Sequence, residues 1–432
     1  MARKMKDSGI EWIGEIPEGW EITRLKYLAD FEPTCDTSYL TDESKITYTP
    51  MECVKNGGFE NRSALYGNLS HTLTPFQNGD IAMAKVTPCF ENGNIAIMDN
   101  LFSGFGLGSS ELFIFRPKSI STRYFFYWLQ NKAFVARACS TMTGTGGLKR
   151  ISPSFIRNCP VHCPSTDEQT KISDYLDAKC SEIDDLLTSV RSSIEEYKKL
   201  KQAVITQAVT KGVRGEREMK DSGVEWIGKI PREFDPVQLK FFCKLITDGT
   251  HFSPTTVENG WPYITAGDVH GIGLDYNSAK RISEDDFQLL VAQGCQPLKG
   301  DVLLVKDGAT TGRVGFVDSD TPCVILSSVA MLRPADKTDG HYLMYLLASD
   351  FLQKQILVSM AGSAMPRTTL TKLTKYIGLL PPLYEQKEIS NYLDAKCAEI
   401  DGLIAKKEQL VKELESYKKS LIYEVVTGKR EV

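Results

Sequence analysis

Basic and amide side chains are the residues of this sequence whose type and spacing best suit a chemical task. The segments Gly147-Leu148-Lys149-Arg150 and Met365-Pro366-Arg367-Thr368-Thr369 align at an offset of 217 residues, so that Arg150 matches Arg367 in segments that otherwise differ. Arginine and lysine can bind phosphate groups or the edge of guanine, whereas asparagine and glutamine suit adenine. Most such side chains in any protein are only solvated. The candidate nucleic-acid contacts are Lys85, Asn92, Asn94, Lys149, Arg150, Arg157, Lys306, Arg313, Arg367, Thr369, Lys372 and Lys375.

Motifs that carry catalysis are missing from this sequence. It has no GxxxxGK[ST] phosphate loop, and Leu379–Leu383 lacks the polar and aromatic residues that amino-methyltransferases place around Pro-Pro. The Gly-rich stretches 104–108 and 144–147 are expected to be ordinary loops, because neither clearly stands between a strand and a helix. The segment Cys159–Cys163 contains a Cys-His-Cys cluster but lacks the second pair of a tetrahedral zinc site. We therefore expect neither a catalytic residue nor a bound metal or cofactor.

Composition limits the class of protein. A chain of 432 residues is long enough for two ordinary domains, and 42% hydrophobic with 25% charged residues is typical of a soluble globular protein. No apolar run approaches a membrane span, and the opening MARKMKDSG lacks the apolar core of a signal peptide, so a cytoplasmic location is expected. Eleven singly scattered cysteines favour a reducing compartment. The net charge of −4 gives no hint of nucleic acid, although a local basic face can bind DNA on an acidic protein.

Two segments of the sequence occur twice. MKDSGIEWIGEIP (Met5–Pro17) returns as MKDSGVEWIGKIP (Met219–Pro231) with eleven of thirteen positions identical. EQTKISDYLDAKCSEID (Glu168–Asp184) returns as EQKEISNYLDAKCAEID (Glu385–Asp401) with thirteen of seventeen identical. The order is motif, variable block, helix, and then the same again. Between the two halves, TKGVRGERE leads from the first helix into the second MKDSG. Joining the final TGKREV to the opening MARKMKDSG would reproduce this junction, so we expect the termini to lie close together.

The segments that begin with the second motif have the apolar spacing of coiled-coil helices. In both segments apolar residues recur at alternate steps of four and three, interrupted in the second segment by Lys407. Gly212 and Gly428 are suited to end the two helices. Each helix should extend for about 40 residues, or about 60 Å. The simplest arrangement pairs the two helices antiparallel around a pseudo-dyad; the alternative is that each seam packs on its own block. The proposed seam positions are Leu176, Ile183, Leu187, Ile194, Leu393, Ile400, Ile404 and Leu414.

The variable blocks, Ile22–Cys163 and Val237–Leu380, share a skeleton. Gly79-Asp80-Ile81 with Lys85 matches Gly300-Asp301-Val302 with Lys306, and in each block short β-type runs precede one helical run. The predicted fold class is α+β: two α/β domains with mostly β cores, joined by two long antiparallel coiled-coil helices with cyclic pseudo-two-fold symmetry. The predicted boundaries are 1–164, 165–212, 213–382 and 383–432.

The duplicated motifs resemble the specificity subunit of type I restriction-modification enzymes. The resemblance rests on WIGEIPEGWEITRLKYLA before a block and EQTKISDYLDAKCSEIDDL at the start of a helix, each with its second copy, and it covers essentially the whole chain. It implies two target-recognition domains, each reading one half of a bipartite double-stranded DNA site in the major groove, and helices that set the spacer. It also implies a subunit without a catalytic centre. One departure is Phe234, which replaces the usual tryptophan of Ile-Pro-x-x-Trp.

The resemblance also implies partners. These are two modification subunits, which bind S-adenosylmethionine and methylate adenine, and two restriction subunits driven by ATP and Mg²⁺. Two other readings stay open at this point. A coiled-coil protein scaffold would give no sequence-dependent shift of DNA, and a self-contained methyltransferase would bind S-adenosylmethionine as the lone chain.

Overall fold

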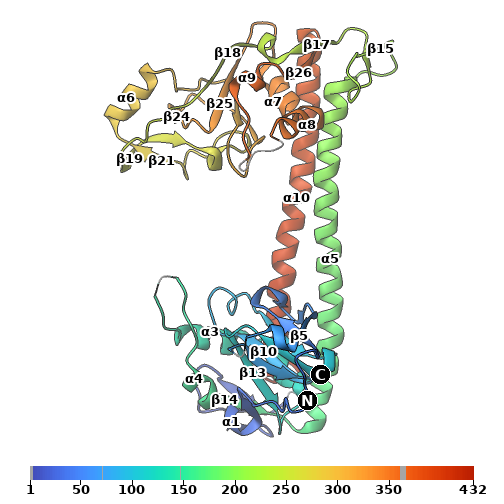
Figure 1. Cartoon of the computed structure of the whole chain (residues 1–432), viewed down its shortest axis with the longest axis vertical. Helices are drawn as coiled ribbons and strands as arrows, with labels where there is room; N and C mark the ends of the chain where they lie inside the picture. The colour runs from blue at the N-terminus through green and yellow to red at the C-terminus, as the bar shows by residue number, and fades with distance from the viewer. Residues whose placement is uncertain (1–2, 71, 146, 361–365) are drawn as a thin grey trace. The chain divides into compact units, whose positions relative to one another are not determined.

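The chain folds as two units that share both long helices. The computed structural model describes residues 3–70, 72–145, 147–360 and 366–432. Unit 1 comprises Met1–Arg191 and Gln409–Val432, and unit 2 comprises Ser192–Glu408. The helices α5 (Thr166–Lys211) and α10 (Leu383–Val426) are therefore divided between the units (Figure 1).

The repeated opening motif forms the same two-stranded hairpin in each unit, β1 (Met5–Asp7) with β2 (Glu15–Pro17) and β15 (Met219–Asp221) with β16 (Lys229–Pro231). The Asp7 carboxylate accepts a 2.9 Å hydrogen bond from the Gly9 amide, and Asp221 accepts the same bond from Gly223. Both glycines have φ near +70°, which favours glycine. The turn and the buried Ile-Pro that follows it explain most of the identity between the two copies.

The block of unit 1 contains two four-stranded sheets. Its strands are β3 (Glu21–Arg24), β4 (Ala29–Phe31), β5 (Lys45–Thr49), β6 (Val54–Lys55), β7 (Gly58–Phe59), β8 (Arg62–Leu65), β9 (Thr74–Gln77), β10 (Asp80–Ala84), β11 (Ile95–Met98), β12 (Phe105–Gly108), β13 (Leu112–Pro117) and β14 (Pro160–Cys163). One sheet has the order β11-β10-β13-β4, the other β8-β5-β12-β9, and β14 pairs with β3. The helices are α1 (Leu25–Leu28), α2 (Thr122–Trp128), α3 (Lys132–Ser140) and α4 (Pro153–Asn158).

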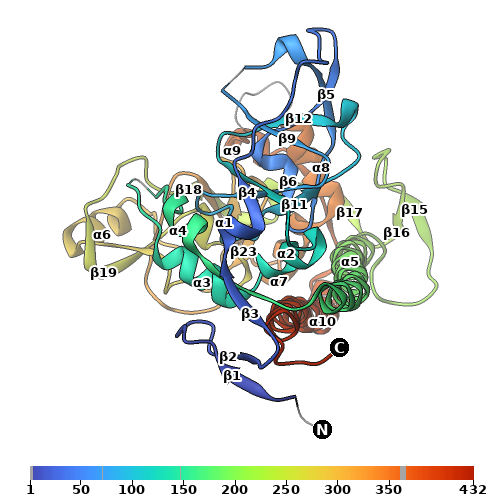
Figure 2. The ribbon, with the colours of Figure 1, turned by 90° about the horizontal axis from the view of Figure 1, so that it is seen from below.

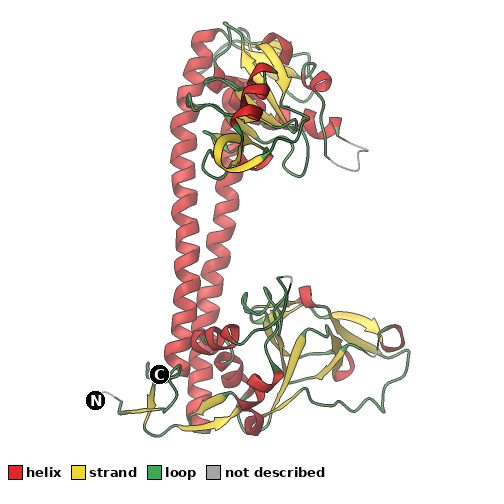
Figure 3. Ribbon diagram, turned by 90° about the vertical axis from the view of Figure 1, so that its left-hand side faces the viewer, coloured by secondary structure: helices red, strands yellow, loops and turns green. Residues whose placement is uncertain are grey.

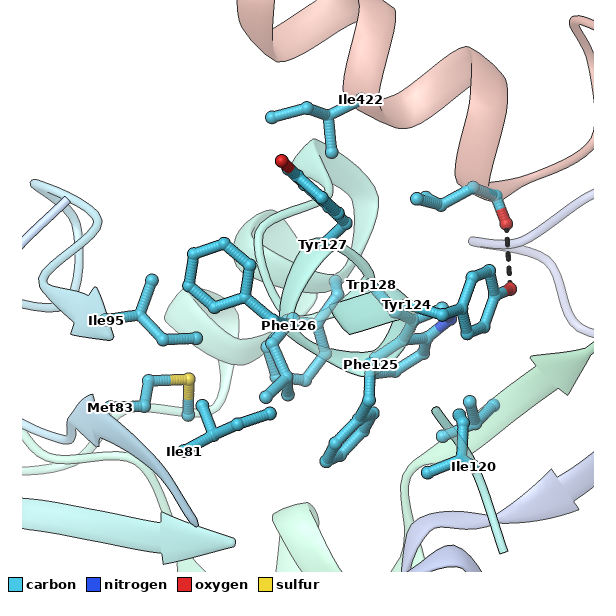
Figure 4. Close-up of a cluster of buried hydrophobic side chains, with 14 of the residues drawn as sticks. Ile81, Met83, Ile95, Ile120, Tyr124, Phe125, Phe126, Tyr127, Trp128 and Ile422 are labelled. Atoms are coloured by element: carbon cyan, nitrogen blue, oxygen red, sulfur yellow. Dashed lines mark hydrogen bonds between the residues drawn. The ribbon is translucent and has the colours of Figure 1, made fainter. Parts of the chain in front are cut away.

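The core of unit 1 lies between the first of these sheets, α2 and the long helices. Five consecutive aromatic residues of α2, Tyr124 to Trp128, are buried against β10, β11 and the end of α10 (Figure 4). The Tyr124 hydroxyl donates to the Val426 carbonyl at 3.2 Å, which is the dashed line in Figure 4. The C-terminal turn of α10 is therefore part of the same core as the block.

The block of unit 2 repeats this frame and adds to it. Its strands are β17 (Asp235–Gln238), β18 (Cys243–Asp248), β19 (Thr256–Ile264), β20 (Gly271–Ile272), β21 (Lys280–Ile282), β22 (Val302–Val305), β23 (Val314–Phe316), β24 (Val324–Ile325), β25 (Val329–Pro334) and β26 (Ile377–Leu380). The main sheet has the order β18-β25-β22-β23-β20, a second sheet the order β21-β19-β24, and β17 pairs with β26. The helices are η4 (Leu239–Phe241), η5 (Ala266–Asp268), α6 (Glu284–Ala292), α7 (Gly340–Ala348), α8 (Asp350–Ser359) and α9 (Leu370–Leu373). Figure 3 shows that both blocks combine strands, in yellow, with helices, in red.

The structure corrects two local expectations. The helical run predicted in each block is two helices, α2 with α3 and α7 with α8. The break falls at buried polar residues: Asn131 caps α3 by accepting from the Phe134 amide, and Ser349 is the single residue between α7 and α8. The Gly-rich stretch 104–108 is mainly the buried strand β12, where a side chain at Gly106 would collide with the Phe76 ring. Its glycines therefore serve close packing. In the other stretch, Gly146 lies outside the described residues.

The long helices are paired antiparallel within each unit, as predicted (Figures 1 and 2). In unit 1, Asp184 pairs with Lys418 at 2.7 Å and Arg191 with Glu415 at 2.6 Å, so residue numbers rise along α5 as they fall along α10. In unit 2, Lys201 pairs with Asp401 at 2.6 Å. The helices extend for 46 and 44 residues.

The seam positions face the interior. Leu176, Ile183, Leu187, Ile194, Leu393 and Ile400 are buried, and Ile404 and Leu414 are half-buried. In unit 1, Leu176, Ile183, Leu187 and Leu414 belong to one cluster with both helices and the block, and in unit 2 Leu393 belongs to the equivalent cluster. At these positions the helices pack both on each other and on the block, so the predicted pairing and its alternative both occur. Lys407 lies 5.6 Å from the centre of the Tyr197 ring, a cation–π contact that places a cation in the seam. Within the described part of the chain, no helix is long and apolar enough to cross a membrane.

Candidate nucleic-acid interface

In unit 1 the candidate residues lie mainly on two loops that are hydrogen-bonded together. The hairpin loop, residues 85–94, connects β10 to β11, and the bridge loop, residues 141–152, connects α3 to α4. The Thr87 amide donates to the Lys149 carbonyl at 2.9 Å, and the Ile151 amide donates to the Lys85 carbonyl at 3.0 Å. The Thr87 hydroxyl donates to the Gly147 carbonyl at 3.0 Å. The two loops therefore form one surface whose path is fixed by backbone groups.

Unit 2 builds the equivalent surface from a hairpin loop at residues 306–313 and a bridge loop, of which 366–369 are described. The Thr368 amide donates to the Lys306 carbonyl at 2.9 Å, and the Gly308 amide donates to the Pro366 carbonyl at 3.0 Å. An isolated antiparallel bridge joins Asp307 to Arg367, as one joins Val86 to Arg150 in unit 1. The alignment of Arg150 with Arg367 therefore corresponds to the same structural position.

Both of these arginines are held by a carboxylate. The Arg150 guanidinium donates through Nε and Nη2 to the two Glu111 oxygens at 2.9 and 2.7 Å, and Arg367 Nε lies 2.9 Å from Asp307 Oδ1. The hydrogen bonds from Arg150 hold the pKa of Glu111 below its usual value. Both arginine side chains remain exposed. Each is thus oriented before any ligand arrives, and its charge is partly offset.

Lys306 is placed differently from the other candidates. Its side chain is only 3% exposed, and Nζ lies 3.2 Å from Asp248 and 2.9 Å from Asp307. A buried lysine with two carboxylate partners is not presented to a duplex, so we assign it a structural role and leave it out of the proposed contact set. Its counterpart Lys85 is half-buried, with Nζ 5.4 Å from the centre of the Phe113 ring.

The remaining candidates are distributed over the same two surfaces. Asn92 and Asn94 lie at the end of the hairpin loop and line a cavity of about 710 Å³ within unit 1, which is also lined by residues of both long helices. Arg157 lies on α4, over the Phe31 ring. Thr369 caps α9 by accepting from the Lys372 amide. Half-buried Arg313 lies on the hairpin loop of unit 2, and Lys149, Lys372 and Lys375 are exposed, with Lys372 Nζ donating to the Ser359 carbonyl.

Two buried ion pairs in the frame were not identified as such from the sequence. Arg116 donates two 2.8 Å hydrogen bonds to the fully buried Asp80, and Arg333 binds Asp301 in the same way. In unit 1 the pair joins Asp80, the first residue of β10, to the neighbouring strand β13. In unit 2 it joins Asp301, the residue before β22, to the neighbouring strand β25. Both halves of the sequence contain the same Gly-Asp and Arg-Pro motifs, but only the structure shows that the aspartate of one motif binds the arginine of the other.

A third duplicated cluster holds the opening motif on the long helices. In unit 1, Arg3 pairs with Glu168 at 2.5 Å and the Trp20 indole donates to the same carboxylate at 2.9 Å. In unit 2, Arg217 pairs with Glu385 at 2.5 Å and lies over the Phe234 ring. The substitution of Phe234 for tryptophan therefore preserves the aromatic packing and removes one hydrogen bond.

The Cys-His-Cys cluster is structural. His162 is buried, and its Nε2 atom lies 2.7 Å from the Val426 carbonyl, while its ring stacks on Trp20. Burial lowers the pKa of His162 to about 4, so the ring is neutral at pH 7. Burial also raises the pKa of the Cys159 and Cys163 thiols to about 12. Across the described residues, no group of three or more His, Cys, Asp or Glu side chains is placed to hold a metal ion.

Comparisons with known proteins agree with this architecture. The model of the "Type I restriction modification DNA specificity domain" matches residues 17–196 and 231–413. The chain is 25% identical over 435 residues to the type I restriction enzyme MjaVIII specificity subunit of Methanocaldococcus jannaschii, covering 96% of this chain and 93% of that protein. A chain from a structural study of complex assembly and conformational transition of the type I R-M system superposes with a TM-score of 0.72 at 18% identity, covering 96% of this chain and 99% of that one.

The match to the family model covers most of both halves of the chain. The chain belongs to the type I restriction-modification DNA specificity family. It is also 34% identical over 196 residues to the type I restriction enzyme EcoAI specificity subunit of Escherichia coli, over 44% of this chain. That alignment spans 33% of the EcoAI subunit, and the alignment with the EcoEI subunit of the same organism spans 27%.

Proposed function

We propose that this chain is the non-catalytic subunit that gives a type I restriction-modification complex its DNA sequence specificity. The block of each unit reads one half of a bipartite site in the major groove. The paired helices set the length of the unread spacer and dock two modification subunits. The methyl donor S-adenosylmethionine, and the ATP and Mg²⁺ used by two restriction subunits, belong to the partner chains.

The observation that carries this proposal is the duplicated frame with different loops. Both units contain the same buried Asp–Arg pair and the same Arg–Glu contact to the opening motif. Both also fix an exposed arginine on joined hairpin and bridge loops. A common frame with divergent surface residues is what two readers of unequal half-sites require, because duplex DNA has a dyad but its two half-sites differ in sequence.

The acidic net charge is compatible with this function. At −4, the chain alone has little general attraction for the phosphate backbone. Partner subunits can supply phosphate contacts, which position the complex, while the loops of this chain supply contacts to base edges. We assign base reading to the exposed or half-buried candidates, with Arg150 and Arg367 as the pair common to both units.

A block exchange tests the proposal. The segment Ile22–Cys163 is replaced by the equivalent block of a relative with a different target, and the methylated motif is read by methylation-sensitive sequencing of the host genome. We expect one half of the split motif to change while the other half and the spacer are retained. The matched control exchanges Val237–Leu380 and should change the other half.

Three outcomes would contradict the proposal. Loss of both halves after either exchange would mean that the blocks do not read independently. Absence of any sequence-dependent DNA shift by the complex would favour a protein scaffold. Methyl transfer by the purified chain alone would refute the non-catalytic assignment.

A further inference from the structure

One exposed pair of residues is retained in both halves without a structural reason inside the molecule. Lys26 and Tyr27 on α1 correspond to Lys240 and Phe241 on η4. Tyr27 is 64% exposed and Phe241 is 61% exposed. Each lysine Nζ lies over its neighbour's ring, at 5.1 and 5.0 Å from the centre. We call these two surfaces the Lys–aromatic patches.

The surrounding exposed positions have drifted, even in the sign of their charge. Glu15 of the first copy corresponds to Lys229 of the second, and Glu18 corresponds to Arg232. Several of the other retained residues have a structural role, in the turn hydrogen bonds or on the buried faces of the hairpins. Within the described residues, neither Lys26 nor Lys240 forms an ion pair with a carboxylate, and each contacts the exposed ring beside it.

Each patch is attached to the rest of its block by a backbone hydrogen bond. The Leu25 amide donates to the Cys159 carbonyl at 2.9 Å, and the equivalent Leu239 amide donates to Tyr376 at 2.8 Å. These bonds attach α1 to the residue that follows α4 and η4 to the residue that precedes β26. Each patch therefore presents an exposed aromatic ring beside one lysine ammonium group.

We infer that the Lys–aromatic patches are the docking points of one protein partner that binds the chain twice, once on each unit. A surface that reads DNA sequence should differ between the halves, whereas a surface that binds two copies of the same chain should be retained. The change from tyrosine to phenylalanine drops the hydroxyl, so the shared features are the ring and the ammonium group. The partner should offer an apolar pocket with a carboxylate at its rim.

A protein partner explains the ring better than the DNA backbone does. A phosphate group can pair with lysine, but it offers no apolar surface to phenylalanine, and an exposed apolar ring gains most from burial in a protein pocket. Aromatic side chains are enriched among the residues that dominate protein interfaces. Given the proposed function, on which this inference rests, the partner is the modification subunit.

The test counts bound partners in the complete complex. The full chain is co-expressed with the modification subunit of its own system, and the stoichiometry is measured by native mass spectrometry over a concentration series. We expect Tyr27→Ser to weaken one of two binding events by on the order of tenfold or more, Phe241→Ser to weaken the other, and the double variant to weaken both. Tyr27→Phe should bind as the wild type does, because Phe241 already lacks the hydroxyl.

Controls separate the possible failures. Glu18→Arg, which copies a difference between the halves, should leave both binding events unchanged, and thermal melts should show that all variants fold. If the wild type binds two partners and the double variant does so equally tightly, the inference is wrong and the proposed function stands. If the serine variants retain both partners but weaken the DNA shift, the patches bind DNA and the inference is likewise wrong. A wild type that binds no modification subunit would remove the proposed function and this inference together.

Discussion

At the scale of single residues, the most informative difference between the two units is a position that is polar in one unit and apolar in the other. His162 on β14 corresponds to Leu379 on β26. In unit 1 the ring contacts the Val426 carbonyl, which also accepts from Tyr124. In unit 2 the equivalent tyrosine, Tyr342, donates to the Leu379 carbonyl. The histidine therefore adds a contact to the last turn of α10 that unit 2 does without.

This difference predicts a pH dependence of stability specific to unit 1. Because the pKa of His162 is lowered to about 4 in the fold, the unfolded chain takes up a proton between pH 6.5 and about 4 that the folded chain does not. Stability should thus fall as the pH falls through this range, by up to about 3 kcal/mol from this group. His162→Leu should remove that part of the slope in urea unfolding of unit 1.

The control for this prediction is a histidine at the surface. His270 is exposed, and His270→Gln should leave the pH dependence as it is in the wild type. A His162→Leu chain whose stability falls with pH as steeply as that of the wild type would show that burial of this ring does not couple to protonation.

At the scale of elements, the long helices were the most predictable part of the fold. Their apolar spacing gave the seam, and Gly212 and Gly428 end the helices with φ of +71° and +70°. The repeated strand motifs likewise located the central strands β10 and β22. These signals are local in sequence, so periodicity and turn residues were sufficient to identify them.

Features that depend on distant contacts were not predictable. Lys306 matched Lys85 in the alignment, but Asp248 and Asp307 bury it in unit 2. The break between α2 and α3 depends on Asn131 finding a buried backbone partner, and the packing of Gly106 depends on the Phe76 ring. For the candidate interface, the sequence located the joined loops of both units, and the carboxylates that orient Arg150 and Arg367 were found only in the structure.

An insertion tests the role of the helices in setting the spacer. Seven residues are two turns, about 10 Å, and they keep the seam in register. Inserting seven helix-forming residues after Arg191 in α5 and after Glu408 in α10 should lengthen the spacer of the methylated motif by about three base pairs at 3.4 Å each. Genome methylation sequencing measures the result.

The matched control inserts the same residues after Gly215, in the exposed segment that follows α5. It should leave the spacer unchanged. A spacer that keeps its length when both helices are extended would show that another feature sets it.

At the scale of the whole molecule, both chain ends attach to the beginning of α5. Arg3 pairs with Glu168, and the Arg430 guanidinium lies 5.8 Å from the centre of the Tyr175 ring. The corresponding place in unit 2 is continuous chain, where Arg217 donates to the Lys211 carbonyl and pairs with Glu385. The expected closeness of the termini is therefore present in unit 1.

This arrangement predicts that the chain tolerates circular permutation. Joining Val432 directly to Met1 and opening the chain between Gly215 and Glu216 exchanges the covalent junction of one unit for that of the other. We expect the permuted chain to fold and, with its modification subunit, to shift the same DNA sequence as the original. As a control, opening the chain inside β10, after Ala82, should abolish folding. A permuted chain that folds but selects another sequence would contradict the equivalence of the two junctions.

The way the hairpin and bridge loops are fastened bears on how such proteins change. Because main-chain amides and carbonyls, along with the Thr87 hydroxyl, hold the two loops together, the outward side chains contribute little to keeping their path. Under the proposed function, a replacement at one of those positions should alter which bases are favoured while the fold is preserved. If each block reads one half-site as proposed, single substitutions in one block would change its half of the target and leave the other half unchanged.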